Sequence, residues 1–544
     1  MIGRILSRAA GRVLGLPAPT GGRITVRRHL PVRVRDGVTL RTDHYAPQRS
    51  GAPTVLIRTP YGRGGPMRLL ARLIADQGLH VVVQSCRGTF GSAGTFEPLV
   101  HERADGLDTI DWLRRQPWYA GSFGMFGASY QGFTQWAVAP DVGADLAALV
   151  LVATASTTRD STYSGDSFAL DTVLTWAELI AAQTVPRLAR QVELKRGQPR
   201  LLAGLAHLPL AEADRVATGA TVGFFQEWLR HDTAIDYWRP RVFDDGVSRV
   251  AAPVAMVTGW QDIFLPAQLA DYAALRAAGR RPYLIIGPWT HGSVGLFGAA
   301  LRDGLAWFRA HLAGDPAALR AAPVRIHVGG GGGWRDLPDW PPPATPTRWH
   351  LQPDGGLATA GPPPSAPDRF RYDPADPTPS LGGPLLVSHR AGPVDNRPLE
   401  ARPDVLVYTS EPLARPLAVV GAVTGLIHLR STVPYLDVFI RLCDVDRRGR
   451  SWNVTDGLVR VVPGDHPADA VLRVAVTCWP VAHRFRRGHR IRLQVSGGAH
   501  PRYARNPGTG EPLATAVRLL AGDREVLHDP ENPSSVTLPV SYQL

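Results

Sequence analysis

The chain has 544 residues, 44% of them hydrophobic and 20% charged, which is ordinary for a globular protein of about three domains. No apolar run approaches the roughly 20 residues that a membrane helix needs, so we expect no integral membrane segment. The net charge of +13 comes almost entirely from arginines scattered over the chain, with Lys195 the only lysine, so nucleic acid is not an expected partner.

Residues 1–22 form an arginine-bearing N-terminal segment. Arg4, Arg8 and Arg12 recur at fourfold spacing, and apolar side chains occupy roughly the opposite face. The pattern predicts a short amphipathic helix that lies on a membrane surface or on the protein itself. The segment lacks the continuous apolar core of a secretory signal, and docking on the protein is the favoured interpretation.

Residues 23–155 alternate strands and helices, which predicts a doubly wound, mostly parallel sheet. A turn at Asp36-Gly37 should join strands over 24–34 and 38–45, because Asp-Gly is a strong hairpin signal. The other elements predicted here are strands at 54–58, 79–84 and 146–153 and helices at 67–77 and 101–116.

Residues 124–136 read as a short apolar strand, a tight turn with Ser129 at its apex, and a helix. The small residues Gly127 and Ala128 allow a sharp turn that exposes the serine hydroxyl, and a helix N-terminus favours developing negative charge. The common nucleophile elbow is G-x-S-x-G, whereas the second glycine here is Gly132, one place late. A helix-capping role for the serine is the alternative.

A carboxylate and then a histidine follow the serine, which is the order that α/β-hydrolases use. Asp262 comes after a buried strand at 254–258, and His291 comes after a strand at 283–286. Functional groups gather at the carboxyl ends of strands in open α/β sheets. Serine, aspartate and histidine at three strand ends predict a catalytic triad of Ser129, Asp262 and His291.

The separation of Ser129 from Asp262 is too long for one or two βα units. Residues 156–247 are therefore predicted to be an inserted helical cap over the active site, which would shape the acyl pocket and limit water access. The sheet should resume over 248–335, and its last predicted element is a helix at 301–313. The predicted cap helices are 168–182, 184–195 and 222–230.

The C-terminal part begins after a five-glycine run, 329–333, and a proline-rich stretch. These predict a loop and a linker at 336–347, and no Lys-Ser/Thr pair follows that would make the glycines a phosphate-binding loop. Residues 348–544 contain many short β-branched runs separated by turns, typical of an all-β sandwich. Predicted strands include 417–420, 425–431, 437–443, 470–476 and 489–495.

Cys86, Cys443 and Cys478 are odd in number, far apart and without a C-x-x-C pair. They predict neither a zinc site nor a disulfide framework, and a reducing compartment, the cytoplasm, is the simple expectation. The sequence leaves the oligomeric state open, with a homodimer among the alternatives.

Many ordered segments resemble the CocE/NonD group of serine hydrolases, which includes cocaine-esterase-like enzymes and X-prolyl dipeptidyl-peptidases. The resemblance runs from about residue 30 almost to the C-terminus and implies an α/β-hydrolase with a C-terminal jelly roll. The matching segments, apart from the elbow, are 58–62 (RTPYG), 84–88 (QSCRG), 259–262 (GWQD), 287–291 (GPWTH), 372–377 (YDPADP), 408–413 (YTSEPL) and 501–507 (PRYARNP).

The resemblance also implies roles for four further residues. Tyr61 matches a tyrosine whose hydroxyl donates into the oxyanion hole, and Tyr130 matches the residue whose backbone N–H is the second donor. Trp176 and Phe264 match positions that line the acyl or leaving-group pocket. Hydrogen-bond donors of an oxyanion hole often make the largest single contribution to catalysis, about 3 to 4 kcal/mol each.

The predicted activity is acyl transfer through a covalent Ser129 intermediate, without metal or organic cofactor. The leading substrate is a small ester, and release of dipeptides from X-Pro peptides or acyl transfer from amino-acid esters or β-lactams are alternatives. These alternatives need carboxylates to bind an ammonium group; the cap candidates are Asp160, Asp166, Asp171 and Glu178. A non-catalytic binding protein is a more remote hypothesis.

Overall fold

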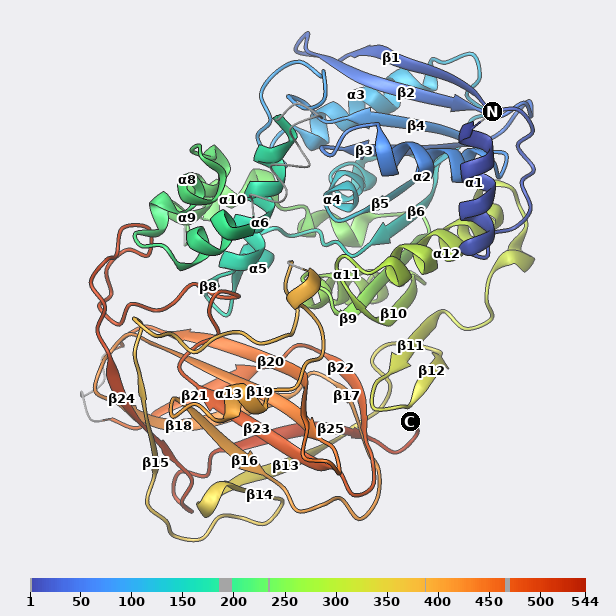
Figure 1. Cartoon of the computed structure of the whole chain (residues 1–544). Helices are drawn as coiled ribbons and strands as arrows, with labels where there is room; N and C mark the ends of the chain where they lie inside the picture. The colour runs from blue at the N-terminus through green and yellow to red at the C-terminus, as the bar shows by residue number, and fades with distance from the viewer. Residues whose placement is uncertain (1, 185–197, 233–234, 387, 465–469) are drawn as a thin grey trace.

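The computed structural model describes residues 2–184, 198–232, 235–386, 388–464 and 470–544 (Figure 1). Within these residues an N-terminal sheet has ten strands in the order β1-β2-β4-β3-β5-β6-β9-β10-β11-β12. From β4 to β11 neighbouring strands are parallel, while β1, β2 and β12 pair antiparallel at the edges. The mostly parallel sheet is thus confirmed. Its strands are β1 Thr25–Arg33, β2 Thr39–Ala46, β3 Thr54–Thr59, β4 His80–Ser85, β5 Phe123–Ala128, β6 Leu146–Val152, β9 Val254–Gln261, β10 Tyr283–Thr290, β11 Val324–Val328 and β12 Gly333–Leu337.

Helices cover both faces of this sheet, which explains why β3 and β4 are buried along their whole length. One apolar core lies between the sheet and α1, α2 and α12, and the other lies on the α3, α4 and α11 side. The helices are α1 Ile2–Val13, α2 Gly65–Ala75, α3 Glu102–Arg114, α4 Tyr130–Trp136, α11 Leu265–Ala277 and α12 Val294–Leu312.

The N-terminal segment forms α1, which lies on the protein beside α2 and α12 (Figure 1). The Ser7 hydroxyl donates to Asp76 Oδ2 at 2.7 Å. Arg302 Nη1 on α12 donates to the carbonyl of Leu14, directly after α1, at 2.9 Å. These two bonds fix the helix to the α/β sheet domain.

Two predictions for the end of the sheet are wrong. The sheet does not end at the helix after β10, because β11 and β12 extend it as a hairpin around the five-glycine loop. Only three side chains of β11 alternate into the core, too short a pattern to predict a strand. The helix begins at Val294, earlier than position 301, because Gly295 and Gly298 lower helix propensity and hide its first turns.

The insertion between β6 and β9 is helical and has its own apolar core, which includes Phe168, Leu174, Phe225 and Trp238. The predicted helix 168–182 corresponds to α6, and 222–230 corresponds to α9. The predicted helix 184–195 lies, except for its first residue, outside the described residues. The elements are α5 Arg159–Thr162, β7 Tyr163–Ser164, β8 Ser167–Phe168, α6 Leu170–Ala181, α8 Ala213–Thr218, α9 Gly223–Arg230 and α10 Ile235–Trp238.

The C-terminal part is β-rich, as predicted, and packs below the cap and the first sheet (Figure 1). All five predicted strands are present, and the buried apolar side chains of this part form a core of their own. Within the described residues, no helix is long and apolar enough to span a bilayer. The elements are β13 Thr345–Gln352, β14 Gly356–Ala358, β15 Asp368–Tyr372, α13 Arg397–Glu400, β16 Val405–Thr409, β17 Leu417–Gly421, β18 Thr424–Ser431, β19 Leu436–Val445, β20 Ser451–Val461, β21 Leu472–Thr477, β22 Val481–Phe485, β23 Arg490–Ser496, β24 Gly522–Leu527 and β25 Ser535–Ser541.

Candidate active site

Ser129 stands at a sharp turn between β5 and α4. Its backbone has φ 57° and ψ −125°, a region that L-residues rarely adopt and that costs about 1 to 3 kcal/mol. The turn brings the end of β5 so close to the first turn of α4 that a Cβ on Gly127 would lie 2.3 Å from Gln131 Cβ. This is the strained geometry of a nucleophile elbow, in which the serine hydroxyl projects beyond the strand.

The displaced second glycine has a packing reason. A Cβ on Gly132 would lie 2.2 Å from Thr154 Cγ2, so α4 approaches the end of β6 as closely as a glycine permits. The Thr154 hydroxyl also donates to the carbonyl of Ser129 at 2.8 Å. Gln131 occupies the position where the common motif has glycine, and its side chain bridges Ala128 N–H and Thr59 Oγ1, both at 3.2 Å.

The strand order places the predicted site at a topological switch point. The chain runs from β3 outward to β4 and then returns to β5 on the other side of β3. Tyr61 follows β3 and Ser129 follows β5, so they lie at the carboxyl ends of neighbouring strands. In open α/β sheets a crevice for ligands forms at this place.

Asp262 and His291 follow the adjacent strands β9 and β10 and are in direct contact. His291 Nδ1 lies 2.9 Å from Asp262 Oδ2, and the carboxylate is fully buried. Asp262 Oδ1 accepts a second hydrogen bond, from the Phe264 N–H at 2.8 Å. The carboxylate therefore holds the proton on Nδ1 of the imidazole, which leaves Nε2 able to accept one.

Tyr61 and Trp176 meet beside Ser129. Trp176 Nε1 donates to the Tyr61 hydroxyl at 3.2 Å. Burial raises the pKa of Tyr61 to about 12, although the neighbouring Trp176 and Ser129 side chains partly offset this by favouring the phenolate. The phenol is therefore neutral at any ordinary pH and keeps a proton to donate.

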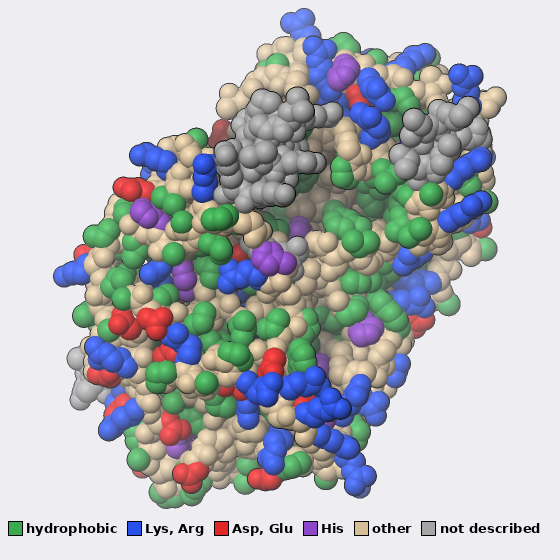
Figure 2. Space-filling model, viewed as in Figure 1, with side chains coloured by type: hydrophobic (Ala, Val, Ile, Leu, Met, Phe, Trp, Pro, Cys, Tyr) green, Lys and Arg blue, Asp and Glu red, His purple; other side chains and the backbone are tan. Residues whose placement is uncertain are grey.

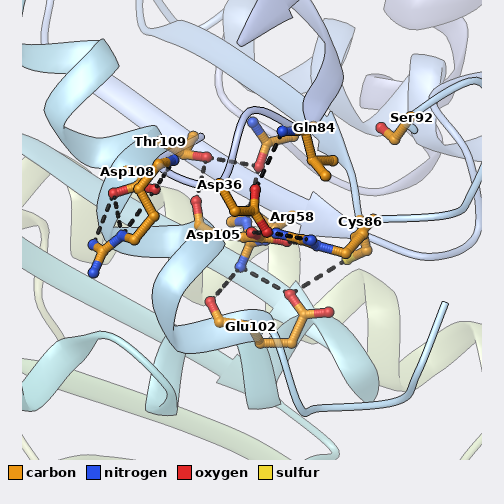
Figure 3. A network of polar contacts seen from close by, with 12 residues as sticks. Asp36, Arg58, Gln84, Cys86, Ser92, Glu102, Asp105, Asp108 and Thr109 are labelled. Atoms are coloured by element: carbon orange, nitrogen blue, oxygen red, sulfur yellow. Dashed lines mark hydrogen bonds and ion pairs between the residues drawn. The ribbon is translucent and has the colours of Figure 1, made fainter. Parts of the chain in front are cut away.

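Tyr130 has its side chain in a buried polar network beneath the elbow. Its hydroxyl accepts from Leu99 N–H at 2.8 Å and donates to Glu102 Oε1 at 2.9 Å. Glu102 forms an ion pair with the fully buried Arg58 on β3 at 2.8 Å (Figure 3). As the first residue of α4, Tyr130 has no acceptor within the helix for its backbone N–H.

Neither Arg58 nor Glu102 is recognisable as a functional residue from the sequence. Arg58 lies within the RTPYG segment, and a buried arginine there requires a carboxylate partner. Breaking such a pair leaves an uncompensated buried charge, so this ion pair fixes the relative position of β3, α3 and α4.

One cavity of about 820 Å³ brings the predicted residues together. Its walls include Ser129, His291, Tyr61, Tyr130, Trp176 and Phe264, from both halves of the sheet and from the cap. Phe264 packs edge-on against the His291 ring at 5.4 Å. The C-terminal part contributes Leu386 to the wall, so it shapes the cavity as well as bracing the sheet.

None of the four cap carboxylates, Asp160, Asp166, Asp171 and Glu178, lines the Ser129 cavity. Among the described residues that line the Ser129 cavity, none is Asp, Glu, Lys or Arg. Asp160 and Asp166 line a neighbouring cavity of about 410 Å³ together with Arg159 and Arg502. Asp171 Oδ2 accepts a hydrogen bond from Leu386 N–H at 2.9 Å. No described carboxylate is thus available in the Ser129 cavity to bind an ammonium group.

The fold and the elbow define the protein as an α/β-hydrolase. Residues 36–293 match the family of X-Pro dipeptidyl-peptidases (S15 family), and residues 317–537 match the X-Pro dipeptidyl-peptidase C-terminal non-catalytic domain. The chain is 32% identical to a cocaine esterase from Rhodococcus sp. (strain MB1 Bresler), across 95% of this chain and 99% of that one. It is 26% identical to a putative serine esterase from Mycobacterium bovis, across 94% of each chain.

A solved α-amino acid ester hydrolase superimposes with a TM-score of 0.83 and 22% identity, across 97% of this chain and 98% of that one. An aminopeptidase from a Thaumarchaeota archaeon superimposes with a TM-score of 0.80 and 23% identity, across 96% and 97%. At these identities the two structures establish the shared fold. The chain belongs to the CocE/NonD family of serine hydrolases.

Proposed function

We propose that this protein is a carboxylesterase in which Ser129 is the nucleophile, His291 the general base and Asp262 the group that orients the histidine. The observation that carries the proposal is the contact of His291 with a buried Asp262 at one wall of a cavity that Ser129 also lines and whose described wall residues include no Asp, Glu, Lys or Arg. Tyr61 and the Tyr130 backbone N–H are the proposed oxyanion donors, and Trp176 and Phe264 the pocket residues.

The mechanism has two acyl-transfer steps. His291 takes the proton from the Ser129 hydroxyl as the oxygen attacks the ester carbonyl, and it then protonates the departing alcohol. Water, deprotonated by the same imidazole, attacks the acyl-serine and releases the acid. The Tyr61 hydroxyl and the Tyr130 N–H stabilise the negative oxygen in both tetrahedral intermediates.

An X-Pro dipeptidyl-peptidase is the second candidate, because residues 36–293 match the family of those enzymes. The described wall residues favour the ester, since a peptide substrate with a free α-ammonium would bring a positive charge into a cavity without a described carboxylate.

The test compares initial rates on p-nitrophenyl butyrate and Ala-Pro-p-nitroanilide, with wild type and Ser129→Ala. We expect hydrolysis of the ester alone, reduced by a factor of at least about 10⁴ in the variant. Cleavage of the anilide would identify a dipeptidyl-peptidase. Ester turnover near the wild-type rate in folded Ser129→Ala would refute the nucleophile.

For location we propose a reducing compartment, the cytoplasm. Cys86, Cys443 and Cys478 are all buried and free, which is typical of proteins kept in such a compartment.

A further inference from the structure

The Ser129 cavity is not confined to the cap and the strand ends. It also extends onto the face of the sheet that α2 and α12 cover, where its walls are Met67, Leu70, Leu73, Phe126, Phe297 and Leu301. Leu14, directly after α1, lines it as well. We refer to this part of the cavity as the α2–α12 groove.

The groove has an exposed apolar rim. Leu69, Val294 and Phe297 are 38%, 79% and 46% exposed, although large apolar side chains are usually buried, and all three line the cavity. Figure 2 shows hydrophobic side chains gathered over α2 and α12 beside a hollow in the surface. An apolar patch that leads into a catalytic cavity indicates a ligand with a hydrocarbon part.

The described walls of the α2–α12 groove are apolar. None of its described wall residues carries a charge, and its side chains are aliphatic or aromatic. We propose that the groove binds the alkyl chain of an ester whose carbonyl lies at Ser129, so that the enzyme prefers esters with a chain of about eight carbons or more. This inference rests on the proposed esterase function and adds its substrate class.

Burial of each methylene should raise kcat/KM by about twofold to fourfold, until the groove is filled. The assay uses p-nitrophenyl acetate, butyrate, octanoate and dodecanoate for chains on the acyl side, and octyl against ethyl acetate for chains on the alcohol side. The side whose series rises identifies which part of the ester occupies the groove. Equal kcat/KM along both series would overturn the proposal.

Phe297→Glu places a charge at the exposed rim, where folding should tolerate it. We expect the ratio of octanoate to acetate kcat/KM to fall at least tenfold. Val517→Glu is the matched control, because Val517 is 62% exposed in the C-terminal part and does not line the cavity. The same ratio in both variants would contradict the groove.

A binding measurement separates this inference from the proposed function. Ligand binding to Ser129→Ala is measured by tryptophan fluorescence, since Trp176 and Trp228 line the cavity. We expect 2-undecanone to bind at least tenfold more tightly than 2-hexanone. Tight ketone binding without ester turnover in wild type would refute the esterase and leave the groove. Normal acetate turnover without ketone binding would refute the groove alone. Binding only to phosphatidylcholine vesicles would overturn it in favour of a lipid-surface site.

Discussion

At the scale of single residues, the candidate site depends on how each polar group is held. The Asp262 carboxylate accepts hydrogen bonds from His291 and from the Phe264 N–H, and its side chain has no exposed surface. The Tyr61 hydroxyl oxygen accepts a hydrogen bond from Trp176, so the hydroxyl proton remains free to be donated to another acceptor. Both side chains are thus oriented before substrate arrives, and such preorganisation is what an oxyanion hole and a triad require.

Tyr61→Phe should lower kcat by roughly tenfold to a thousandfold with little change in KM, because the lost donor acts on charge that develops in the transition state. Steady-state kinetics on p-nitrophenyl butyrate measures this. Because the pKa of Tyr61 is raised to about 12 by burial, ionisation of the phenol should not reduce the wild-type rate up to pH 10. An unchanged kcat in the variant would remove Tyr61 from the oxyanion hole.

Asp271 on α11 is a buried carboxyl whose ionisation opposes folding. Burial raises its pKa from 3.8 to about 7, despite hydrogen bonds from Ser156 N–H and Oγ. The folded state therefore holds a proton that the unfolded state loses above pH 4. Its favourable contribution to stability is complete below that pH and is lost as the pH rises through 7.

Asp271→Asn should abolish this pH dependence, because the amide keeps the shape and stays neutral. Between pH 5 and pH 8 the stability of the variant relative to wild type should rise by about 3 kcal/mol, most of it below pH 7. Thermal unfolding at pH 5, 6, 7 and 8 measures the gain, with Asp354→Asn at an exposed position as control. Parallel Tm curves for wild type and Asp271→Asn would contradict the assignment.

At the scale of elements, the close approach of α4 to the strand ends sets the position of Ser129. The sequence of the elbow could be predicted to make a strand, a turn and a helix, because small residues and apolar runs are visible in it. The role of Gly132 could not be predicted, since a glycine is required there because of Thr154, which follows the neighbouring strand β6. The start of α12 and the β11–β12 hairpin could not be predicted for local reasons: two glycines lower the helix propensity of the first turns, and β11 is too short for its alternation to indicate a strand.

Gly132→Ala should destabilise the protein by about 1 to 3 kcal/mol, because the new methyl group would force Thr154 away from α4. Since Thr154 also bonds the Ser129 carbonyl, ester hydrolysis should fall as well. Gly223→Ala is a suitable control, since nothing lies within 4 Å of a Cβ at that helical position. Equal Tm and activity for the two variants would show that α4 has room to move.

At the scale of the whole molecule, three parts of the chain meet at one cavity. The sheet supplies Ser129 and His291, the insertion supplies Trp176, and the C-terminal part supplies Leu386. The three strand-end residues could be predicted because each follows its own strand in the sequence. The cavity's extension between α2 and α12 could not, because it depends on how helices far apart in the chain pack together. The jelly-roll topology and the domain limits stay predictions.

If Ser129 is a nucleophile activated by His291 and Asp262, its hydroxyl should react with serine-directed reagents. The most direct measurement is to treat the folded protein with a fluorophosphonate and map the adduct by peptide mass spectrometry. We predict a single stoichiometric adduct on Ser129, absent in Ser129→Ala and slowed at least a hundredfold in His291→Ala. Labelling of another serine, or no labelling of folded protein that hydrolyses esters, would show that Ser129 is not the nucleophile.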